Sequence, residues 1–252
     1  MKPEQARTAA SQVAIVTGAS SGIGRAIVCA LSKEGINLCL VGRNSTALAR
    51  VAMEAQALGV RAVPCPVDLT RDEEISGFNS TFLKHFDRLD ALVHSAGIIS
   101  RGAVAVAPVE EFDLQWKTNV RAPYYLTQLL LPSLRKCQGQ IVFVNSSAGL
   151  IAREGIAQYA ATKHALKAIA EALRSEENRN GIRVLSMFLG RTATPMQEEV
   201  HRQEGSSYLP SQLLQPEDVA EAVANALRCA RTAEVTDLHL RSMLKPHSSG
   251  QQ

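Results

Sequence analysis

Val13-Ala-Ile-Val-Thr-Gly-Ala-Ser-Ser-Gly-Ile-Gly24 is the stretch that decides the fold. It opens on an apolar run with the composition of a buried strand, and the residues after it have the composition of a helix. In the turn between them, Gly18 and Gly22 can adopt backbone conformations closed to other residues, while Gly24 permits close helix packing. Strand, glycine turn and helix in this order predict a phosphate-binding helix N-terminus, although a glycine turn without a ligand has the same composition.

The alternation of strand and helix continues along the chain. Apolar runs predict strands near 13–17, 37–42, 61–66, 89–94, 140–145, 182–188 and 235–240. Helical patterns occur near 22–34, 45–58, 71–86, 109–136, 156–179 and 216–231. We therefore expect an α/β fold, in which a doubly wound parallel seven-stranded sheet carries helices on both faces. Pro123 and Pro132 should bend or end the helix 109–136.

Length and composition agree with one domain. The chain has 252 residues, of which 46% are hydrophobic, and this is enough for a large core without a second domain. We expect residues 1–11 to form a loose arm, 12–241 the domain and 242–252 a tail. The arm lacks the apolar core of a signal peptide, and no apolar run approaches the length of a membrane span. We expect a cytoplasmic protein with no membrane partner.

Charge and the spacing of cysteines and histidines argue against a nucleic-acid-binding protein and against a metalloprotein. The net charge of +3 comes from lysines and arginines spread along the chain, which is too weak a signal for nucleic acid. The five cysteines form no C-x-x-C pair and most lie in apolar segments, so we expect free thiols. The six histidines form no cluster with cysteines or acids, and we therefore expect no metal.

Tyr159 and Lys163 form a second informative pattern, because four positions separate them in a stretch predicted to be helical. Residues at this spacing lie on one helix face, about 6 Å apart. A phenol with a pKa of about 10 is a poor acid or base at neutral pH, and we expect the adjacent ammonium to lower that pKa. Taken alone, a tyrosine four residues before a lysine is also common on helix surfaces.

Ser146 strengthens this pattern, because it follows the predicted strand 140–145 at the sheet edge where α/β proteins bind ligands. Its hydroxyl could hold a substrate oxygen while Tyr159 transfers a proton. These two groups supply what carbonyl reduction or alcohol oxidation needs.

The glycine spacing G-x-x-x-G-x-G, combined with Ser146, Tyr159 and Lys163, resembles the short-chain dehydrogenase/reductase family. The resemblance runs from about Gln12 to Arg241. It implies a Rossmann-like catalytic domain that transfers a hydride between NAD(P) and a small-molecule carbonyl or alcohol. In that family an asparagine, here Asn119, joins the serine, tyrosine and lysine in a proton relay. The tyrosine is its acid and base.

The resemblance also implies which residues bind the dinucleotide. Asp68 would contact the adenine, and Lys163 would hydrogen bond the nicotinamide ribose. The full set implied is Gly18, Ser20, Ser21, Gly22, Ile23, Gly24, Arg43, Asn44, Asp68, Leu69, Ser95, Ala96, Gly97, Tyr159, Lys163, Gly190, Thr192 and Thr194. A polar segment near 190–215 corresponds to the lid that closes over substrate in the family.

Two positions depart from the family pattern. His94-Ser-Ala-Gly97 stands where the family usually carries Asn-Asn-Ala-Gly, and Leu189 stands where it carries proline. Because imidazole both donates and accepts hydrogen bonds, we expect His94 to replace the asparagine in a structural role. These departures also leave an alternative open, a catalytically silent NADP-binding regulatory protein. The complete set of proton-relay residues argues against it.

Arg43 favours NADP(H) over NAD(H). It lies at the end of the second predicted strand, about twenty residues past the glycine turn, where an NAD enzyme places a carboxylate on the ribose. No acid is present there, and a 2′-phosphate would meet Arg43 and Asn44. Two points argue the other way. Arg43 could merely stack on the adenine, and Ser21 stands where many NADP-using relatives carry a second basic residue.

Substrate and assembly are the least determined. Lid residues could line the substrate site or simply pack: Met196, Val200, Tyr208 and Leu209. Arg153 and Glu154 could reach the pocket mouth or form a solvated turn. The family often pairs the helices near 109–136 and 156–179 into homodimers or homotetramers. Apolar residues on these helices could make that contact or pack on their own sheet: Leu126, Leu129, Leu130 and Ala168.

Overall fold

The structure, a computed structural model, describes residues 12–243. The arm predicted over 1–11 and most of the tail predicted over 242–252 lie outside the described residues. In the part described, no helix is both long and apolar enough to cross a membrane.

A seven-stranded parallel sheet forms the centre of the molecule, as the sequence predicts. Its strands along the chain are β1 (Val13–Thr17), β2 (Asn37–Gly42), β3 (Ala62–Pro66), β4 (Ala91–His94), β5 (Gln140–Ser146), β6 (Arg183–Leu189) and β7 (Asp237–Leu240). Their spatial order is β3-β2-β1-β4-β5-β6-β7. The chain therefore reverses its winding direction between β1 and β4, and such a switch point opens a crevice at the carboxyl ends of the strands.

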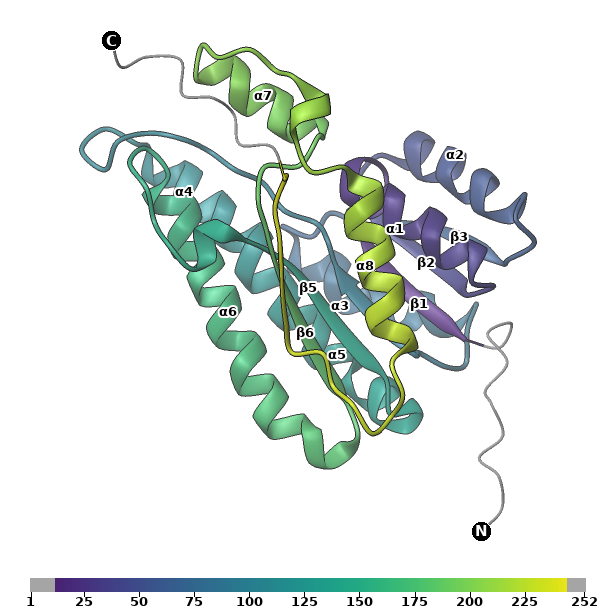
Figure 1. Cartoon of the computed structure of the whole chain (residues 1–252). Coiled ribbons are helices and arrows are strands. Elements are labelled where there is room, and N and C mark those ends of the chain that lie inside the picture. Colours follow the sequence, from purple (N-terminus) through teal and green to yellow (C-terminus); the bar gives the residue numbers. More distant parts are fainter. Residues whose placement is uncertain (1–11, 244–252) are drawn as a thin grey trace.

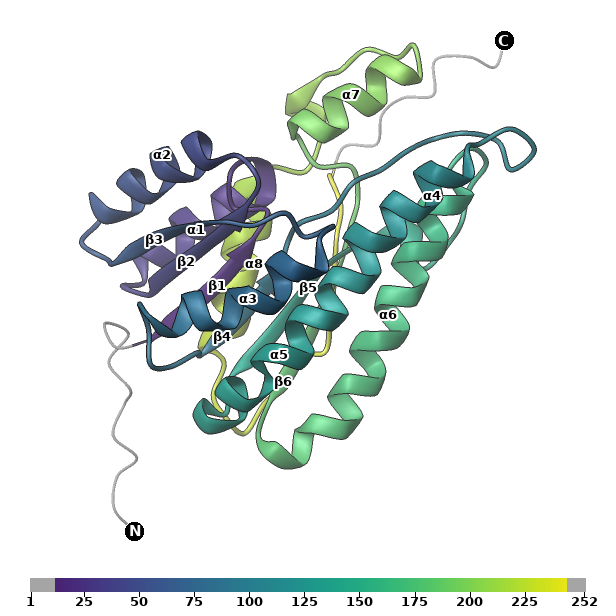
Figure 2. The same ribbon diagram turned by 180° about the vertical axis from the view of Figure 1, so that it is seen from behind.

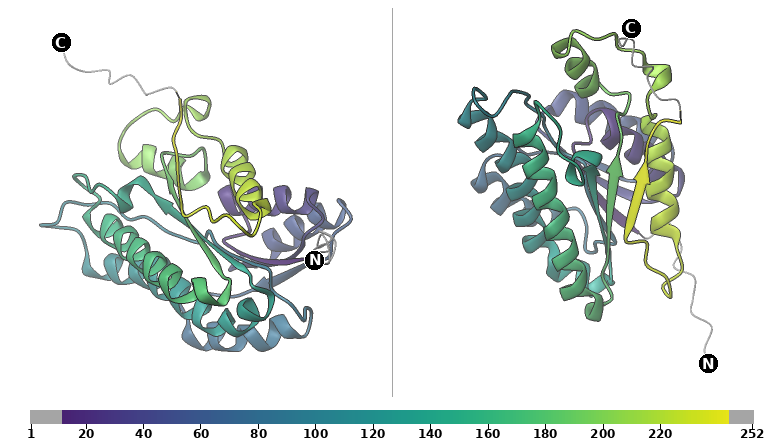
Figure 3. Two further views of the ribbon diagram at one scale, coloured as in Figure 1. Left: turned by 60° about the horizontal axis from the view of Figure 1, so that its bottom comes forward. Right: turned by 60° about the vertical axis from the view of Figure 1, so that its left-hand side comes forward.

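Helices cover both faces of the sheet (Figures 1 and 2). The principal helices are α1 (Gly22–Lys33), α2 (Ser45–Gln56), α3 (Asp72–Leu83), α4 (Val109–Trp116), α5 (Ala122–Cys137), α6 (Ala157–Glu177), α7 (Pro195–Gln203) and α8 (Pro216–Arg228). One core cluster joins the sheet to α1, α2 and α8, and the other joins it to α3, α5 and α6. Figure 3 shows α7 standing apart from both layers, above the sheet edge.

The structure adds detail to two expectations about helices. The segment 190–215, predicted only as a polar lid, contains α7, which begins at Pro195 behind a capping hydrogen bond from Gln197 N to Thr194 Oγ1 (3.2 Å). Its apolar content is too low for a core helix pattern, so the periodicity gave no signal. Pro132 does not end its helix, because α5 continues to Cys137.

The real interruption of the helix 109–136 is a π-helical turn over Lys117–Arg121, which contains Asn119. Pro123 follows it and has no N–H to offer the carbonyl of Asn119, four residues earlier. A wider turn accommodates such a missing donor, and π turns are frequent at functional sites. The irregularity thus falls on a predicted site residue.

The predicted assembly contacts also need correction. Leu126 and Leu130 are buried in the core between α5 and the sheet, so neither is available for a contact with a second copy. Leu129 is partly buried and Ala168 is exposed. An apolar stripe on a helix that covers a sheet is first a core stripe, and here that reason decides two of the four positions.

Candidate active site

The glycine turn after β1 has the conformation that its sequence predicts. Gly18 has a φ of +66° and Gly22 a φ of +51°, values that side-chain-bearing residues rarely adopt. A Cβ on Gly18 would lie 2.8 Å from the Cα of Ala96, and one on Gly24 would lie 2.2 Å from the Gly18 carbonyl oxygen. Only glycine fits at these places, and the turn is pressed against the segment that follows β4.

Thr17, the last residue of β1, fixes that segment. Its Oγ1 accepts hydrogen bonds from the backbone N–H groups of Ser95 and Ala96, both at 3.1 Å. Gly97 then passes close to the centre of the site, because a Cβ there would lie 3.3 Å from Asn119 Oδ1 and 3.8 Å from Lys163 Nζ. The predicted residues Ser95, Ala96 and Gly97 are thus brought between the glycine turn and the proton-relay residues.

The N-terminus of α1 suits a phosphate group. Ser21 is its N-cap, but the serine side chain makes no capping hydrogen bond to the helix. The first N–H groups of a helix have no partner within the helix, and together with the helix dipole they favour an anion. Thr194 reaches the same place from the lid, where its Cγ2 would lie 3.1 Å from a Cβ on Gly22. The chain therefore presents a cradle that fits a dinucleotide pyrophosphate.

Arg43, Asn44 and Asp68 lie at the carboxyl ends of β2 and β3. Asn44 caps α2, accepting a hydrogen bond from Ala47 N at 2.9 Å, and Arg43 is exposed. Partial burial raises the pKa of Asp68, but hydrogen bonds from Thr70 and the charges of Arg43 and Arg71 outweigh it and leave that pKa below its usual value. Two guanidinium groups thus lie near Asp68, but Arg71 is also paired with Glu74 at 3.1 Å, so the charges of these four side chains balance.

The side chains of Ser146 and Tyr159 lie near each other at the carboxyl end of β5, close enough for the serine to lower the phenol pKa. The serine is the last residue of the strand, and its Oγ accepts a hydrogen bond from Ala148 N at 3.1 Å. The expectation that Lys163 lowers the pKa of Tyr159 is wrong for this structure. Burial raises that pKa, and the nearby Ser146 side chain opposes the rise. Tyr159 therefore carries its proton at neutral pH.

Lys163 explains why the expected effect is missing. Its Nζ donates to the carbonyl oxygen of Val144 at 3.1 Å and lies 5.7 Å from the centre of the Tyr159 ring. The amine is thus on the same helix face, as the spacing predicts, but is aimed at the backbone of β5. Burial lowers the pKa of Lys163 to about 8, because a low-dielectric surrounding disfavours the ammonium.

Asn119 ties three segments together. Its Nδ2 donates to Ile98 O at 2.9 Å and to Thr162 Oγ1 at 3.1 Å, while its Oδ1 accepts from Ile98 N at 2.9 Å. The π turn, the segment after β4 and α6 therefore meet at one buried amide. The four residues predicted to relay protons come together at one edge of the sheet, from α6, β5 and the π turn.

Asn145 is a site residue that the sequence-based prediction missed. Its Oδ1 accepts a hydrogen bond from Ser146 N at 2.8 Å, and its Nδ2 donates to Lys163 O at 3.1 Å. It therefore holds the strand that carries the serine against the helix that carries the lysine. The signal available was an amide side chain at the end of an otherwise apolar run, directly before Ser146.

His94 has the structural role that the sequence predicts. It is buried, its Nε2 lies 2.8 Å from Thr127 Oγ1, and its ring stacks on Phe143 with centres 5.0 Å apart. Burial lowers the pKa of His94 to about 3, so the ring is neutral at physiological pH. Leu189, the other departure from the family pattern, is buried as well.

The lid segment begins and ends at one narrow neck. Ala193 N donates to Leu214 O at 2.8 Å, and Leu214 N donates to Arg191 O at 3.1 Å. Of the residues proposed to line it, Val200 is buried and packs, and the Tyr208 hydroxyl donates to Thr194 O at 3.4 Å. The other two, Met196 and Leu209, are exposed, as are Arg153 and Glu154.

Comparison with known proteins agrees with this geometry. The family model described as short chain dehydrogenase matches residues 12–205. The chain belongs to the short-chain dehydrogenase family. An uncharacterised oxidoreductase of Staphylococcus epidermidis is 33% identical over 231 residues, which cover 91% of this chain and 96% of that protein.

Two solved structures are similar in fold to this chain. An alcohol dehydrogenase from Thermococcus sibiricus, complexed with 5-hydroxy-NADP, has a TM-score of 0.85 and 26% identity over 93% of this chain and 98% of its own. A 3-ketoacyl-(acyl-carrier-protein) reductase from Brucella melitensis, complexed with NADH, has a TM-score of 0.80 and 26% identity over 91% and 96%. The chain is thus an oxidoreductase of this family, and the predicted dependence on a nicotinamide nucleotide is supported.

The buried neutral His94 predicts a specific loss of stability in acid. The pKa of the His94 imidazole is about 6.5 in the unfolded chain but about 3 in the folded protein. Its contribution to the free energy of unfolding is therefore complete above about pH 6.5 and falls as the pH is lowered toward 3. Between about pH 7 and pH 5, the wild type should lose about 2 kcal/mol of unfolding free energy that His94→Asn does not lose. Urea denaturation at both pH values measures this difference. Equal losses in the two proteins would show that His94 is not responsible.

Proposed function

We propose that this protein is an NADP(H)-dependent short-chain reductase that converts small-molecule carbonyl compounds to alcohols, with Tyr159 as the proton donor. The observation that carries the proposal is the pairing of the Ser146 and Tyr159 side chains at the carboxyl edge of the sheet, beside a turn shaped for a dinucleotide. Lys163 and Asn119 complete the surroundings of this pair.

A nicotinamide dinucleotide held by the glycine turn and the N-terminus of α1 would supply the hydride for the carbonyl carbon. The Ser146 hydroxyl binds the carbonyl oxygen and orients it toward Tyr159, whose O–H donates the proton as negative charge develops on that oxygen. Asn145 keeps Ser146 and α6 in register through its two hydrogen bonds. Alcohol oxidation follows the same path in reverse, with Tyr159 accepting the proton.

The pKa values of Tyr159 and Lys163 determine which protons these side chains can supply. Because burial raises the pKa of Tyr159, the residue is a protonated donor at neutral pH. A pKa of about 8 for Lys163 lets this amine give up and regain a proton in the physiological range. Asn119 would help hold a water that reconnects the lysine to solvent.

The preference for NADP(H) rests on charge at the ends of β2 and β3. Arg43 and Arg71 both lie near enough to Asp68 to lower its pKa, but Arg71 is also paired with Glu74, so Arg43 would be the guanidinium that meets a 2′-phosphate. Gly18, Gly22 and the N-terminus of α1 would bind the pyrophosphate. Gly190, Thr192 and Thr194 would meet the nicotinamide half from the lid side.

We also propose that copies of the chain associate into dimers or tetramers in the cytoplasm, through exposed positions of α4, α5 and α6. After the burial of Leu126 and Leu130 is taken into account, Leu129 and Ala168 are the remaining predicted contacts. A monomer in sedimentation experiments at assay concentration would remove this part of the proposal.

Removing the proton donor should abolish most turnover. Tyr159→Phe keeps the ring and removes the hydroxyl, so kcat for NADPH-dependent carbonyl reduction should fall by about 10²–10⁴-fold while the Kd for NADPH stays nearly unchanged. Tyr124→Phe, an exposed tyrosine on α5, is the matched control and should keep full activity. NADPH absorbance with a panel of aldehydes, diketones and sugars measures the rate. Wild-type kcat in Tyr159→Phe would rule out the proposed role, and binding of NADPH without oxidation across the panel would favour the silent regulatory protein.

Reversing the charge of Arg43 should lower the preference for NADPH over NADH. The wild type should show the higher kcat/KM with NADPH, and Arg43→Asp should lower the NADPH-to-NADH ratio by at least about tenfold, since a hydrogen bond to a charged group contributes about 1.5–3 kcal/mol. Arg50→Asp, on the exposed side of α2, is the control for charge alone and should leave the ratio unchanged. An advantage for NADH in the wild type would overturn the assignment.

A further inference from the structure

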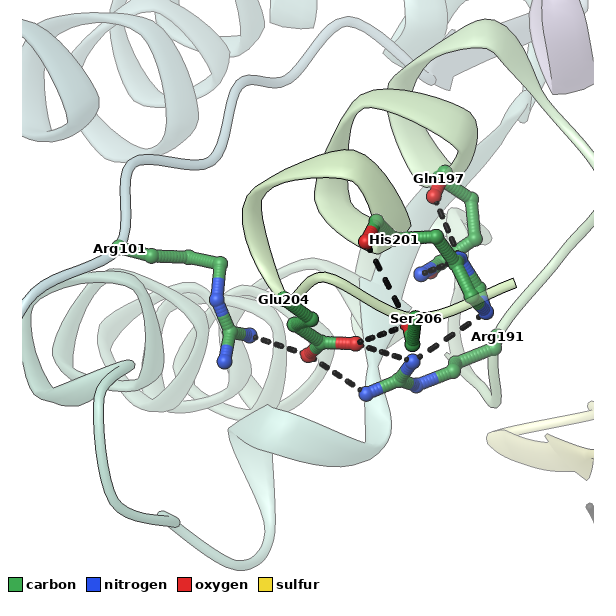
Figure 4. Close-up of polar contacts among 6 residues, drawn as sticks. All are labelled: Arg101, Arg191, Gln197, His201, Glu204 and Ser206. Atoms are coloured by element: carbon green, nitrogen blue, oxygen red, sulfur yellow. Dashed lines mark hydrogen bonds and ion pairs between the residues drawn. The ribbon is translucent and has the colours of Figure 1, made fainter. Parts of the chain in front are cut away.

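Glu204, directly after α7, is bound by two arginines from different segments of the chain (Figure 4). Its two carboxylate oxygens accept from the Nη1 and Nη2 groups of Arg191 at 2.7 and 2.8 Å. On its other side, Oε1 lies 2.9 Å from Nη1 of Arg101. One carboxylate therefore joins the end of α7 to Arg191 and to Arg101. The planar pairing with Arg191 fixes the orientation of the carboxylate toward Arg101.

The two arginines stand on different parts of the site. Arg191 follows β6 and lies at the neck of the lid, where its carbonyl accepts from Leu214 N. Arg101 belongs to the segment after β4, which is tied to the loop before α6 by a hydrogen bond from Gly102 N to Gly155 O at 2.9 Å. That loop leads directly into the helix that carries Tyr159. The contact between Glu204 and Arg101 thus joins the lid to the opposite wall of the candidate substrate site.

An open groove lies at this junction. It has a volume of about 570 Å³, and its walls include Ser100, Arg101, Gly155 and Gln203. Gln203, the last residue of α7, is the groove's contribution from the lid. When the end of α7 moves away from Arg101, this groove must widen. The ion pair therefore lies at an opening between the lid and the loop that leads into α6.

Partial burial makes the contact stronger than an ordinary surface ion pair. The Glu204 side chain is 16% exposed and that of Arg101 is 26% exposed. Partial burial raises the pKa of Glu204, yet the nearby charges of Arg191, Arg101 and His201 outweigh it and leave the pKa below the usual value. The carboxylate is therefore ionised and is held by both partners. By contrast, Glu199 pairs with Arg202 inside α7, both side chains are exposed, and this pair joins the lid to nothing else.

We propose that Glu204 is a positioning residue that latches the lid: its bond to Arg191 fixes the end of α7 over the neck, and its bond to Arg101 closes the lid onto the wall beside Tyr159. The neck itself is secured by backbone hydrogen bonds between 191–193 and Leu214. Only the far end of the lid depends on the side-chain contact. The effect of the latch on turnover rests on the proposed reductase function, but the closure of the lid does not.

Hydrogen–deuterium exchange of the full chain tests the latch without any substrate. Arg101→Gln breaks the contact with the wall and leaves the pairing of Arg191 with Glu204 intact, so exchange in 198–206 should accelerate severalfold, together with that of the Gly102 amide. Glu204→Gln should act in the same direction, and the double variant should add little to either single one. Arg101→Lys keeps the charge and should recover part of the protection.

Glu199→Gln is the matched control, since it removes a carboxylate from the same helix without touching the opposite wall. It should leave the Gly102 amide as protected as in the wild type. Wild-type exchange of 198–206 in Arg101→Gln, or an equal acceleration at Gly102 in Glu199→Gln, would overturn the latch. Because exchange needs no turnover, this result stands even when no carbonyl substrate is reduced.

The same variants separate closure from chemistry once a reduced substrate is available. Arg101→Gln should raise the KM for the carbonyl compound severalfold while kcat stays at the wild-type value or rises, because a looser lid holds substrate less firmly and releases product sooner. A KM equal to that of the wild type would contradict the role in substrate retention.

Discussion

The hydrogen bonds of the buried Asn119 amide are the constraint on which the rest of the site depends. This side chain accepts a hydrogen bond from Ile98 N and donates to Ile98 O and to the Thr162 hydroxyl. It therefore joins the segment after β4 to α6. Leaving such a buried amide without its partners would cost about 1–3 kcal/mol per group. The π turn that carries Asn119 is the backbone geometry that brings the amide to this place.

From this joint, the site is built outward by polar residues at the ends of apolar strands. Thr17 holds the segment after β4 against the glycine turn, and Asn145 holds Ser146 against the helix of Lys163. The proposed catalytic hydroxyls therefore rest on fixed backbone and not on loops. The lid is built differently, because its two ends meet at the neck and the carboxylate of Glu204 joins the end of α7 to the opposite wall. Catalytic residues on rigid elements, beneath a lid that can open, suit substrate entry and release.

Sequence reasoning succeeded where one residue type is required by one backbone geometry or by one period. Glycines at Gly18 and Gly22 need positive φ, and the alternation of apolar runs with helical stretches gives the sheet. It failed where a contact joins residues far apart in the chain. Nothing in the spacing shows that Glu204 meets Arg101, that Lys163 points at Val144 O, or that Leu126 and Leu130 face the core and not a second copy. The pKa of Tyr159 went wrong for the same reason, because helix spacing gives proximity but not the direction of an amine.

Titration of Tyr159 in the cofactor-free protein tests the central claim most directly, namely that a protonated phenol stands ready beside Ser146. The ultraviolet difference spectrum between the wild type and Tyr159→Phe, followed from neutral to alkaline pH, isolates the ionisation of this one residue. The account predicts a pKa above the usual value for tyrosine of about 10. A pKa near neutral pH or below would contradict it, since the residue would then be largely a phenolate and not a donor held ready for reduction.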